Sequence, residues 1–397
     1  MSNSSGVVLL MVLILSAIMF LIASTLLLIT MTEVHIADFE QRSAQALYVA
    51  ESSLTLGLAK LRENPAYRTA TSDTMSIGAN TGLLNVQFHN QSKSLYHFML
   101  RGEGKVPGLN AVAKRTVERQ IVVKPFALFA RENLDLIGGC TINGNIHGNG
   151  TVTIGLTSKI QGDVTSSTLV NNAGTVTGTV SSQEPEMTLP ALPIVFYPPT
   201  YSYNGKTGAA KPLEHDTITL SPVNGVDPPV PSIELYSGFP TADNPAGIFY
   251  PETELQGPWT VLDVTGTVIV PSSGKPLSID GIVTILPVSD DEFKHFPALM
   301  TAGSLHITLL DKDLQKWVKS LKKSRIERAI FAQGDLRITG NDTTGEIIKG
   351  SLLGHTLTIT GNPVFQLAYD STIMSNPPPG IDLIETGEWR ELFGQIN

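Results

Sequence analysis

The residue types that carry chemistry in proteins are present in this chain, but not at the spacings that build a site. Cys140 is the single cysteine, and the eight histidines form neither a His-Glu-x-x-His nor a His-x-His pattern. The run Asp290-Asp291-Glu292 lacks the spacing of a calcium-binding loop, and the glycine-rich stretches lack the Lys-Ser/Thr of a phosphate loop. The sequence therefore predicts no enzyme, no cofactor and no metal, with Cys140 as a small buried hydrophobe.

The other place where a reaction could occur is the junction between a short polar leader and a long apolar run. Gly6 is followed directly by Val7, and the chain then stays uncharged to Met31. These roughly 25 residues are enough to cross a bilayer as one helix. The leader contains no Lys or Arg, and the cysteine lies far from the apolar run, which argues against a cleaved secretory signal and a lipoprotein.

The helical pattern continues past the apolar run. No proline precedes Pro65, and apolar residues recur at helical spacing from Ile36 to Leu61. One helix from Val7 to about Arg62 would be roughly 84 Å long at 1.5 Å per residue. We expect residues 7–31 to form a transmembrane helix and residues 32–64 its amphipathic continuation. The helix should end at residue 64, because Pro65 disfavours helix at the residue before it.

Two stretches resemble a known family. The first is the apolar run Gly6–Leu15 and the second is Ala50-Glu51-x-x-Leu54. Together the first 60 residues resemble the N-terminal pattern of PilX-like minor pilins, within the type IV pilin-like proteins, and are similar to the large K-type pseudopilins of type II secretion. The resemblance implies a leader of residues 1–6 that a prepilin peptidase cuts between Gly6 and Val7, and a filament-core helix that includes Met11 and Glu51.

Met11 departs from the pattern of major pilins, which carry a glutamate at this fifth position after the cut. A subunit without that glutamate cannot pair it with the N-terminal amine of a neighbour inside an apolar core, where an unpaired charge is costly. K-type pseudopilins share the lack. The departure therefore favours a minor or tip position over a bulk subunit.

The resemblance implies a minor pilin or pseudopilin-like structural subunit that joins or primes a type IV pilus-type filament, at low copy or at its tip. Its partners would be other pilin or pseudopilin subunits, the inner membrane and the peptidase. Its head would be periplasmic, its N-terminus cytoplasmic, and the assembled form extracellular. The net charge of −9 argues against nucleic acid as a partner.

Two other functions fit the residues. A single-pass anchored β-helix binding protein or adhesin, neither processed nor polymerised, needs only the apolar run. A β-helix carbohydrate enzyme would need a groove lined by carboxylates. The sequence names no ligand, and it does not separate a pilus from a type II secretion system.

The rest of the chain has the composition of a β protein with many turns: 16% charged residues, 35 Gly and 25 Pro. In residues 65–125 the alternation predicts three antiparallel strands packed on the amphipathic helix half, as in a pilin head. The predicted strands are Asn85–His89, Leu95–Leu100 and Ala113–Val123. We expect Lys114, Arg115 and Arg119 on the solvated face of the third strand.

Residues 126–376 contain an internal repeat. The segment Phe129–Gly139 aligns without gaps to Phe331–Asn341, and Gly340-Asn341 recurs as Gly361-Asn362. Short strands ended by Gly or Asn, about 20 residues apart, predict parallel β-helix-like repeats, because these residues tolerate the sharp corners between strands. The alternative is a β-sandwich.

Two insertions and a tail complete the predicted organisation. Residues 185–258, rich in proline and aromatics, are expected to be irregular. Residues 309–328 are expected to form a helix whose apolar face, with Leu314 and Trp317, docks on the sheet. Residues 377–397 are expected to be a C-terminal tail. The predicted fold class is α+β, mostly β.

Overall fold

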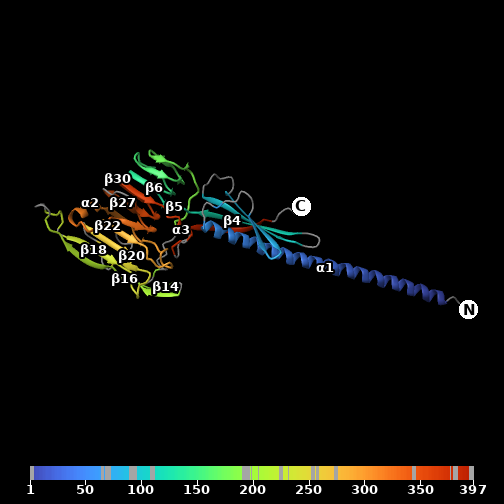
Figure 1. The fold of residues 1–397 in the computed structure, drawn as a ribbon. Coiled ribbons are helices and arrows are strands. Elements are labelled where there is room, and N and C mark those ends of the chain that lie inside the picture. Colours follow the sequence, from blue (N-terminus) through green and yellow to red (C-terminus); the bar gives the residue numbers. More distant parts are fainter. Residues whose placement is uncertain are drawn as a thin grey trace. The chain divides into compact units, whose positions relative to one another are not determined.

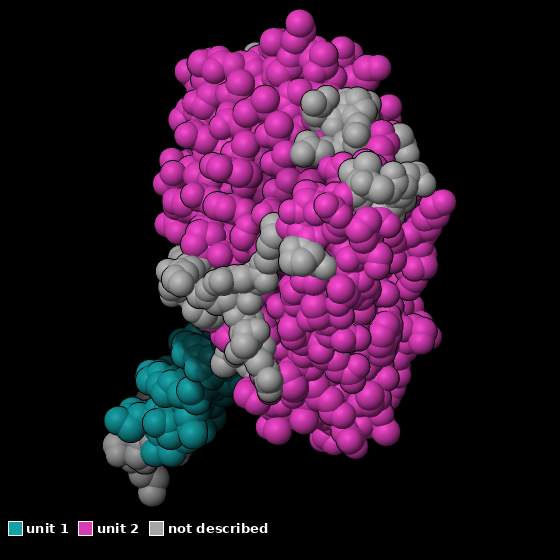
Figure 2. Space-filling view, turned by 90° about the vertical axis from the view of Figure 1, so that its left-hand side faces the viewer, with its two compact units in different colours: residues 1–61, 66–121, 386–397 teal, residues 62–65, 122–385 magenta. Residues whose placement is uncertain are grey.

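The chain divides into two compact units in a computed structural model of all 397 residues. Unit 1 contains residues 1–61, 66–121 and 386–397, and unit 2 contains residues 62–65 and 122–385; Figure 2 colours them separately. The structure describes residues 4–63, 67, 73–88, 96–107, 112–189, 197, 199–203, 205–222, 227–230, 232–251, 255, 259–271, 276–341, 346–375, 377–378 and 383–392.

Unit 1 is one long helix and one sheet. The helix α1 runs without a break from Ser4 to Glu63, close to the predicted end at Arg62. Pro65, His89 and Leu95 lie outside the described residues. The five-stranded sheet adds two strands, the first and the last, to the three that were predicted. Its order is β1 (Asp73–Ile77), β2 (Asn80–Phe88), β3 (His97–Val106), β4 (Ala113–Val123) and β31 (Ile384–Leu392).

Strand β31 comes from the segment that the sequence predicts as a tail. Basic side chains of β4 hold it: Arg115 forms an ion pair with Glu391 at 2.8 Å, and the Nε of Arg119 donates to the carbonyl of Gly387 at 2.9 Å. Arg115 also donates to Ser43 of α1 at 2.7 Å. Two of the side chains predicted to be merely solvated therefore fasten the C-terminal strand.

Unit 2 is a coil of short strands that pair in parallel with strands of the neighbouring turns. We call one turn a rung; it passes over up to three faces. The first face is a ten-stranded sheet, in the order β13 (Val180–Ser181), β10 (Val164–Ser166), β7 (Asn145–Gly148), β5 (Phe126–Ala130), β29 (Leu352–Gly354), β26 (Ile330–Ala332), β23 (Leu299–Thr301), β21 (Thr267–Val270), β19 (Ile248–Tyr250) and β16 (Lys211–Pro212).

The second and third faces share one larger sheet. The second face has the order β11 (Val170–Asn172), β8 (Val152–Ile154), β6 (Leu134–Asn143), β30 (Leu357–Ala368), β27 (Leu336–Asn341), β24 (Leu305–Leu309), β22 (Leu277–Leu286), β20 (Thr260–Thr265), β18 (Ser232–Gly238) and β17 (Glu214–Thr219). The third face is made by the later parts of β6, β30 and β22 together with β12 (Thr175–Val176), β9 (Lys159–Gln161), β28 (Glu346–Lys349) and β25 (Arg325–Glu327).

This pairing confirms the predicted fold class, α+β and mostly β with β-helix-like repeats, over the sandwich alternative. Antiparallel pairs within unit 2, among the residues described, are confined to β17 with β18, a short bridge at Thr241, and the hairpin of β14 (Thr200–Tyr203) with β15 (Lys206–Ala209). Elsewhere the paired strands of the described residues run parallel. They stay in register except for shifts at Phe126/Leu128, Glu346/Ile348 and Gly361/Phe365, so that like residues stack on successive rungs.

The chain enters this stack in its middle. Strand β5, the first of the unit, pairs with β29 on one side and β7 on the other. From β5 the chain winds to β13 at one end, passes to β16 at the opposite end, and winds back until β30 pairs with β6 (Figure 1). Read in spatial order, the coil therefore runs from residue 211 to 369 and continues from 126 to 181.

This order explains the internal repeat. Phe331 lies opposite Leu353, which lies opposite Phe129. The two segments that align in sequence thus occupy the same position two rungs apart. At the corner after this position Gly138 has a φ of +80°, and a methyl group there would overlap the carbonyl oxygen of Gly361. Glycine is required here for both reasons, since other residues rarely adopt this φ.

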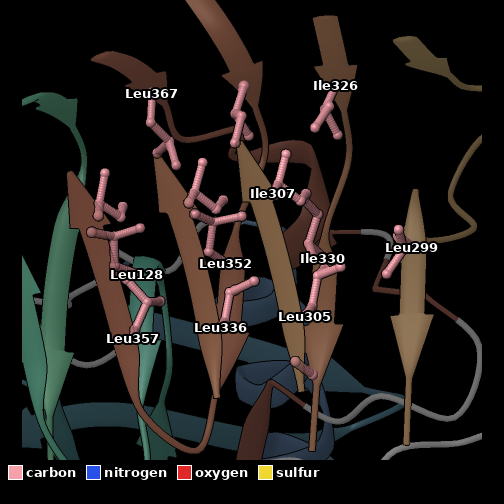
Figure 3. Close-up of a cluster of buried hydrophobic side chains, with 14 of the residues drawn as sticks. Leu128, Leu299, Leu305, Ile307, Ile326, Ile330, Leu336, Leu352, Leu357 and Leu367 are labelled. Atoms are coloured by element: carbon pink, nitrogen blue, oxygen red, sulfur yellow. The ribbon is translucent and has the colours of Figure 1, made fainter. Parts of the chain in front are cut away.

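The interior of the coil is a set of aliphatic ladders. On the first face Leu128, Leu352, Ile330 and Leu299 are register partners in turn, and each is fully buried. Leu357, Leu336 and Leu305 form the matching ladder of the second face. Figure 3 shows these side chains directed into the space that the strands enclose.

Leu352 lies where the two arms of the coil meet, which makes it a sharp test of this packing. We expect Leu352→Ala to lower the free energy of unfolding by about 3 kcal/mol, the usual cost of a cavity left by a buried leucine. Thermal or denaturant unfolding measures it. The matched control is Leu156→Ala, because that side chain is 81% exposed and its loss leaves no cavity. Equal effects of the two changes would contradict the packing.

Two predicted insertions differ from the structure. Residues 211–250, expected to be irregular, supply β16 to β19 and so form rungs. The helix expected over 309–328 is the shorter α2 (Asp311–Trp317), after which Val318 is extended and β25 joins the third face. As predicted, α2 docks through its apolar side: Leu314 is buried and Trp317 packs against the same cluster. A second short helix, α3, spans Thr372–Ser375.

Candidate functional site

The candidate site is the N-terminal half of α1, an apolar surface. Its side chains are strongly apolar, and its most apolar stretch is not buried by any other part of the described chain. Val7, Met11 and Phe20 are 59%, 69% and 74% exposed. Soluble monomers rarely leave so large an apolar patch open to water. By length and composition this helix can cross a membrane, and we identified no other such helix among the described residues.

The hydroxyl groups within this half are turned inward. Ser16 donates to the carbonyl of Leu13 at 2.9 Å, and Thr25 donates to that of Leu21 at 2.8 Å. Ser24, Thr30 and Thr32 make the same kind of bond to the preceding turn. Since a polar group without a partner is costly in hydrocarbon, these bonds keep the whole surface compatible with lipid or with other apolar helices.

From Ser43 to Leu61 α1 has the opposite environment, whereas Ile36 and Phe39, which the sequence places on the same apolar face, are each 53% exposed. Ala46, Ala50 and Ser53 are buried against the sheet of unit 1, as are Val49, Leu54 and Leu61. The environment changes from exposed to buried within one unbroken helix. The apolar part of α1 is therefore joined rigidly to the part that packs on the sheet. The position of one half therefore dictates that of the other.

Small residues set how closely the helix and the sheet approach. A methyl group on Gly104 of β3 would overlap the carbonyl oxygen of Ala46, and one on Gly102 would overlap that of Ala50. On β2, a methyl group on Gly82 would overlap the hydroxyl of Ser53. The glycines of the sheet thus face the alanines and the serine of the helix. Ala50, in the motif that carries the family resemblance, is one of these contact residues.

The four residues predicted to act in processing and assembly all lie on α1. Gly6 and Val7 are in its first turns, and Met11 is among its most exposed side chains. Glu51 is half-buried and follows the contact residue Ala50. The structure brings none of these four together, because they are distributed along one rod. Their roles in cleavage and in the filament core stay predictions.

Sequence reasoning missed the glycines of the sheet, which seat the helix. The run Arg101-Gly102-Glu103-Gly104 predicts a turn, because glycine is frequent in turns, and that prediction is wrong. The structure instead places both glycines inside β3, on the side that faces α1.

Chemically reactive groups are scarce in the part of the chain that the structure describes. We found no group of three or more His, Cys, Asp or Glu side chains arranged to hold a metal ion among those residues. Cys140 is fully buried, as predicted, and its thiol contacts the carbonyls of Ile137 and Ile359 at 3.6 and 3.7 Å. Burial raises the pKa of this thiol to about 11.

Cys140 should therefore resist alkylation in the folded protein. At pH 8 a thiol with this pKa is about one part in a thousand thiolate, the form that reacts, and the reagent has no access to it. We expect no labelling by iodoacetamide in the native protein and one label per chain in guanidinium chloride, measured by intact mass. Rapid native labelling would contradict the buried position.

The comparisons with known proteins add little to this geometry. No family model matches the chain, and no curated protein matches it. Among solved structures, the chain is similar to the competence-associated pilin ComZ from Thermus thermophilus, with 12% identity and a TM-score of 0.35. The match covers 88% of this chain and 98% of ComZ. A TM-score this low carries no conclusion about fold or function, which rest on the residues described above.

Proposed function

We propose that this chain is a pilin-like structural subunit, held in the inner membrane by the apolar half of α1 and able to enter a type IV pilus-type filament through the same surface. One observation supports it above all: a single 60-residue helix is bare and apolar toward its N-terminus and seated on the sheet of unit 1 from Ser43 onward. A plain anchor needs only the first half. One continuous helix that serves both parts suits a filament subunit. Its apolar end can pack among the helices of other subunits while its head lies on the outside of the filament.

The finer role follows from the size of the head and from Met11. More than 300 residues follow α1, and heads this large would collide in a close-packed filament of identical subunits. Met11 also lacks the carboxylate that pairs with a neighbouring amine in major pilins. Both features favour a subunit of low copy number or at the tip, which primes assembly and exposes the β head for adhesion or for subunit contacts. Its partners are other pilin or pseudopilin subunits, and a prepilin peptidase removes residues 1–6.

The competing function is a single-pass anchored β-helix binding protein that is never processed. It is favoured by the absence of Lys or Arg before Gly6, since the family has a basic residue there. N-terminal sequencing of the mature protein, combined with mass spectrometry of sheared filaments, separates the two. A mature N-terminus at Val7 and a low ratio to the main filament protein support the subunit. An intact Met1 and absence from filaments support the anchor.

A substitution at the cleavage position tests the processing step. We expect Gly6→Leu to leave the leader attached, because the bulky side chain blocks the peptidase, and to lower the amount of this chain in sheared filaments at least tenfold. The control is Ser4→Ala, two residues earlier, which should be processed normally. Intact mass and filament mass spectrometry measure both. Normal filament content with the leader retained would contradict the proposal.

A further inference from the structure

Unit 2 carries a long insertion at a corner of the coil, between β24 and β25. On the neighbouring strand β22, Gly281 pairs with the end of β24 and Thr284 pairs with the start of β25, so that only two residues lie between these positions. The chain takes fifteen residues, 310–324, to make the same step from β24 to β25. Connections of this length are uncommon in compact domains and often carry function. The coil could pass this corner with far fewer residues.

The insertion is held in place at both of its ends. The hydroxyl of Ser324 donates to the carboxylate of Asp311 at 2.5 Å and accepts from the amide of Val283 at 3.1 Å. The amide of Leu310 donates to the carbonyl of Gly281 at 2.8 Å. Between these ends four apolar side chains pack in a cluster with side chains of β18, β20 and β22: Leu314, Trp317, Val318 and Leu321. The insertion therefore holds its outer side chains on a fixed support.

The outer side of the insertion is basic. Residues 312–325 contain six Lys or Arg and one Asp, a net charge of +5, in a chain whose net charge is −9. All six cations are exposed: Lys312, Lys316, Lys319, Lys322, Lys323 and Arg325. A surface that serves only for solubility mixes charges of both signs. This excess of one sign on a fixed insertion indicates a binding surface.

Some of these cations have partners within the chain. Lys322 forms an ion pair with Asp263 at 3.2 Å, and Arg325 forms one with Glu327. For Lys316 and Lys319 we found no carboxylate within ion-pair distance in the part of the chain that the structure describes. The charges of these two lysines are therefore open to an outside anion.

We infer that the basic surface formed by residues 312–325 binds an anionic polysaccharide. This inference rests on the proposed function and deepens it, because it names the class of ligand that the exposed head holds. Charge complementarity selects an anionic partner, since a cluster of one sign concentrates ions of the other sign. Five of the six cations are lysines. The lysine ammonium is a compact, hydrated point charge on a flexible stem, which suits carboxylate or sulfate groups repeated along a flexible polymer.

Two other anionic partners fit less well. Protein–protein interfaces are depleted in Lys and enriched in Arg, whereas this surface has the opposite composition. Single-stranded nucleic acid is bound by aromatic rings on which bases stack. The one aromatic residue of the segment, Trp317, is half-buried, packs against Trp259, and has the Lys316 ammonium 5.5 Å from its ring centre. The composition therefore favours a polysaccharide over both.

The test measures binding of the full chain, in micelles of an uncharged detergent, to immobilised dextrans by biolayer interferometry. Carboxymethyl-dextran and dextran sulfate share their backbone with neutral dextran, so that the three differ only in their charged groups. We expect saturable binding to at least one anionic form and none to neutral dextran. Raising the salt from about 50 to 500 mM should weaken the binding at least about tenfold, because salt screens exposed charges. Comparison of the two anionic forms separates carboxylate from sulfate recognition.

Charge reversal locates the binding surface. We expect Lys316→Glu combined with Lys319→Glu to raise the dissociation constant at least about tenfold, because like charges then face the polymer. The matched control is Arg131→Glu combined with Lys159→Glu. Both of these residues are exposed on the other arm of the coil, and the change in net charge is the same. The control should change the dissociation constant less than about threefold, and thermal unfolding shows that each variant keeps its fold.

Three results would overturn the inference. They are no binding to either anionic dextran, equal weakening by the two pairs of substitutions, and tighter binding of polyglutamate or of a single-stranded oligonucleotide of the same charge. The assay requires neither cleavage after Gly6 nor a filament. A chain that binds the anionic dextrans but is absent from filaments would therefore contradict the proposed function alone, and a filament subunit that does not bind them would contradict this inference alone.

Discussion

Gly104→Val should unseat α1 from its sheet. Gly104 lies on β3 directly against the carbonyl of Ala46, and a side-chain carbon there would also lie 2.8 Å from the backbone nitrogen of Ala50. The obstructing atoms are helix backbone, so that no side-chain rotation relieves the overlap and the whole helix must move. We expect a loss of at least about 3 kcal/mol, the upper end of the overpacking range. For a unit of this size that corresponds to a fall in Tm of about 10 °C.

The measurement is thermal unfolding of the detergent-solubilised chain, followed by far-ultraviolet circular dichroism. The matched control is Gly387→Ala, on β31 of the same sheet, where a methyl group meets its nearest neighbour at 3.4 Å and fits without movement. Gly104→Val should destabilise unit 1 and leave the transition of unit 2 unchanged, because the aliphatic core of the coil contains residues of unit 2 alone. Similar effects of the two glycine substitutions would contradict the close helix–sheet contact.

The helix and the repeat could be predicted because their signals are local. An apolar run without proline dictates a helix whatever surrounds it, and α1 ends within a residue or so of the predicted position. The alignment of Phe129–Gly139 with Phe331–Asn341 predicted a repeating β architecture, since like residues at like positions imply like environments. The register of β6, β30 and β27 confirms that interpretation.

The remaining features depend on contacts between distant segments. The residues of Ile384–Leu392 do not by themselves indicate that this segment pairs with β4. The pairing is stabilised by Arg115 and Arg119, some 270 residues earlier, which donate hydrogen bonds to Glu391 and Gly387. The entry of the chain into the middle of the coil is equally non-local, because a repeat has the same pattern in any order. The strands within residues 211–250 could not be predicted either. The proline and aromatic residues of this segment indicate turns more strongly than strands.

The last prediction concerns the place where unit 2 enters unit 1. Strands β4 and β31 are neighbours in the sheet, and their contacts pair Arg115 with Glu391 and Arg119 with Gly387, so that they run in opposite directions. At their ends the amide of Lys124 donates to the carbonyl of Leu383 at 2.9 Å. Two residues joined in this way can be connected by a tight hairpin turn. The whole of residues 125–382 is thus an insertion between two strands that already form a hairpin.

We therefore expect a chain in which Asn-Gly replaces residues 125–382 to fold, although about two thirds of the sequence is gone. Its core, with Ala46, Leu84 and Leu100, belongs to unit 1 and stays complete. In detergent it should unfold cooperatively with a Tm within about 5 °C of the unit 1 transition in the full chain, and Gly104→Val should lower that Tm as it does in the full chain. An excised chain that is unfolded or aggregated would show that the sheet needs the coil to form. If it folds, α1 and its five-stranded sheet form an independently folding domain, and the coil is a second domain inserted between β4 and β31.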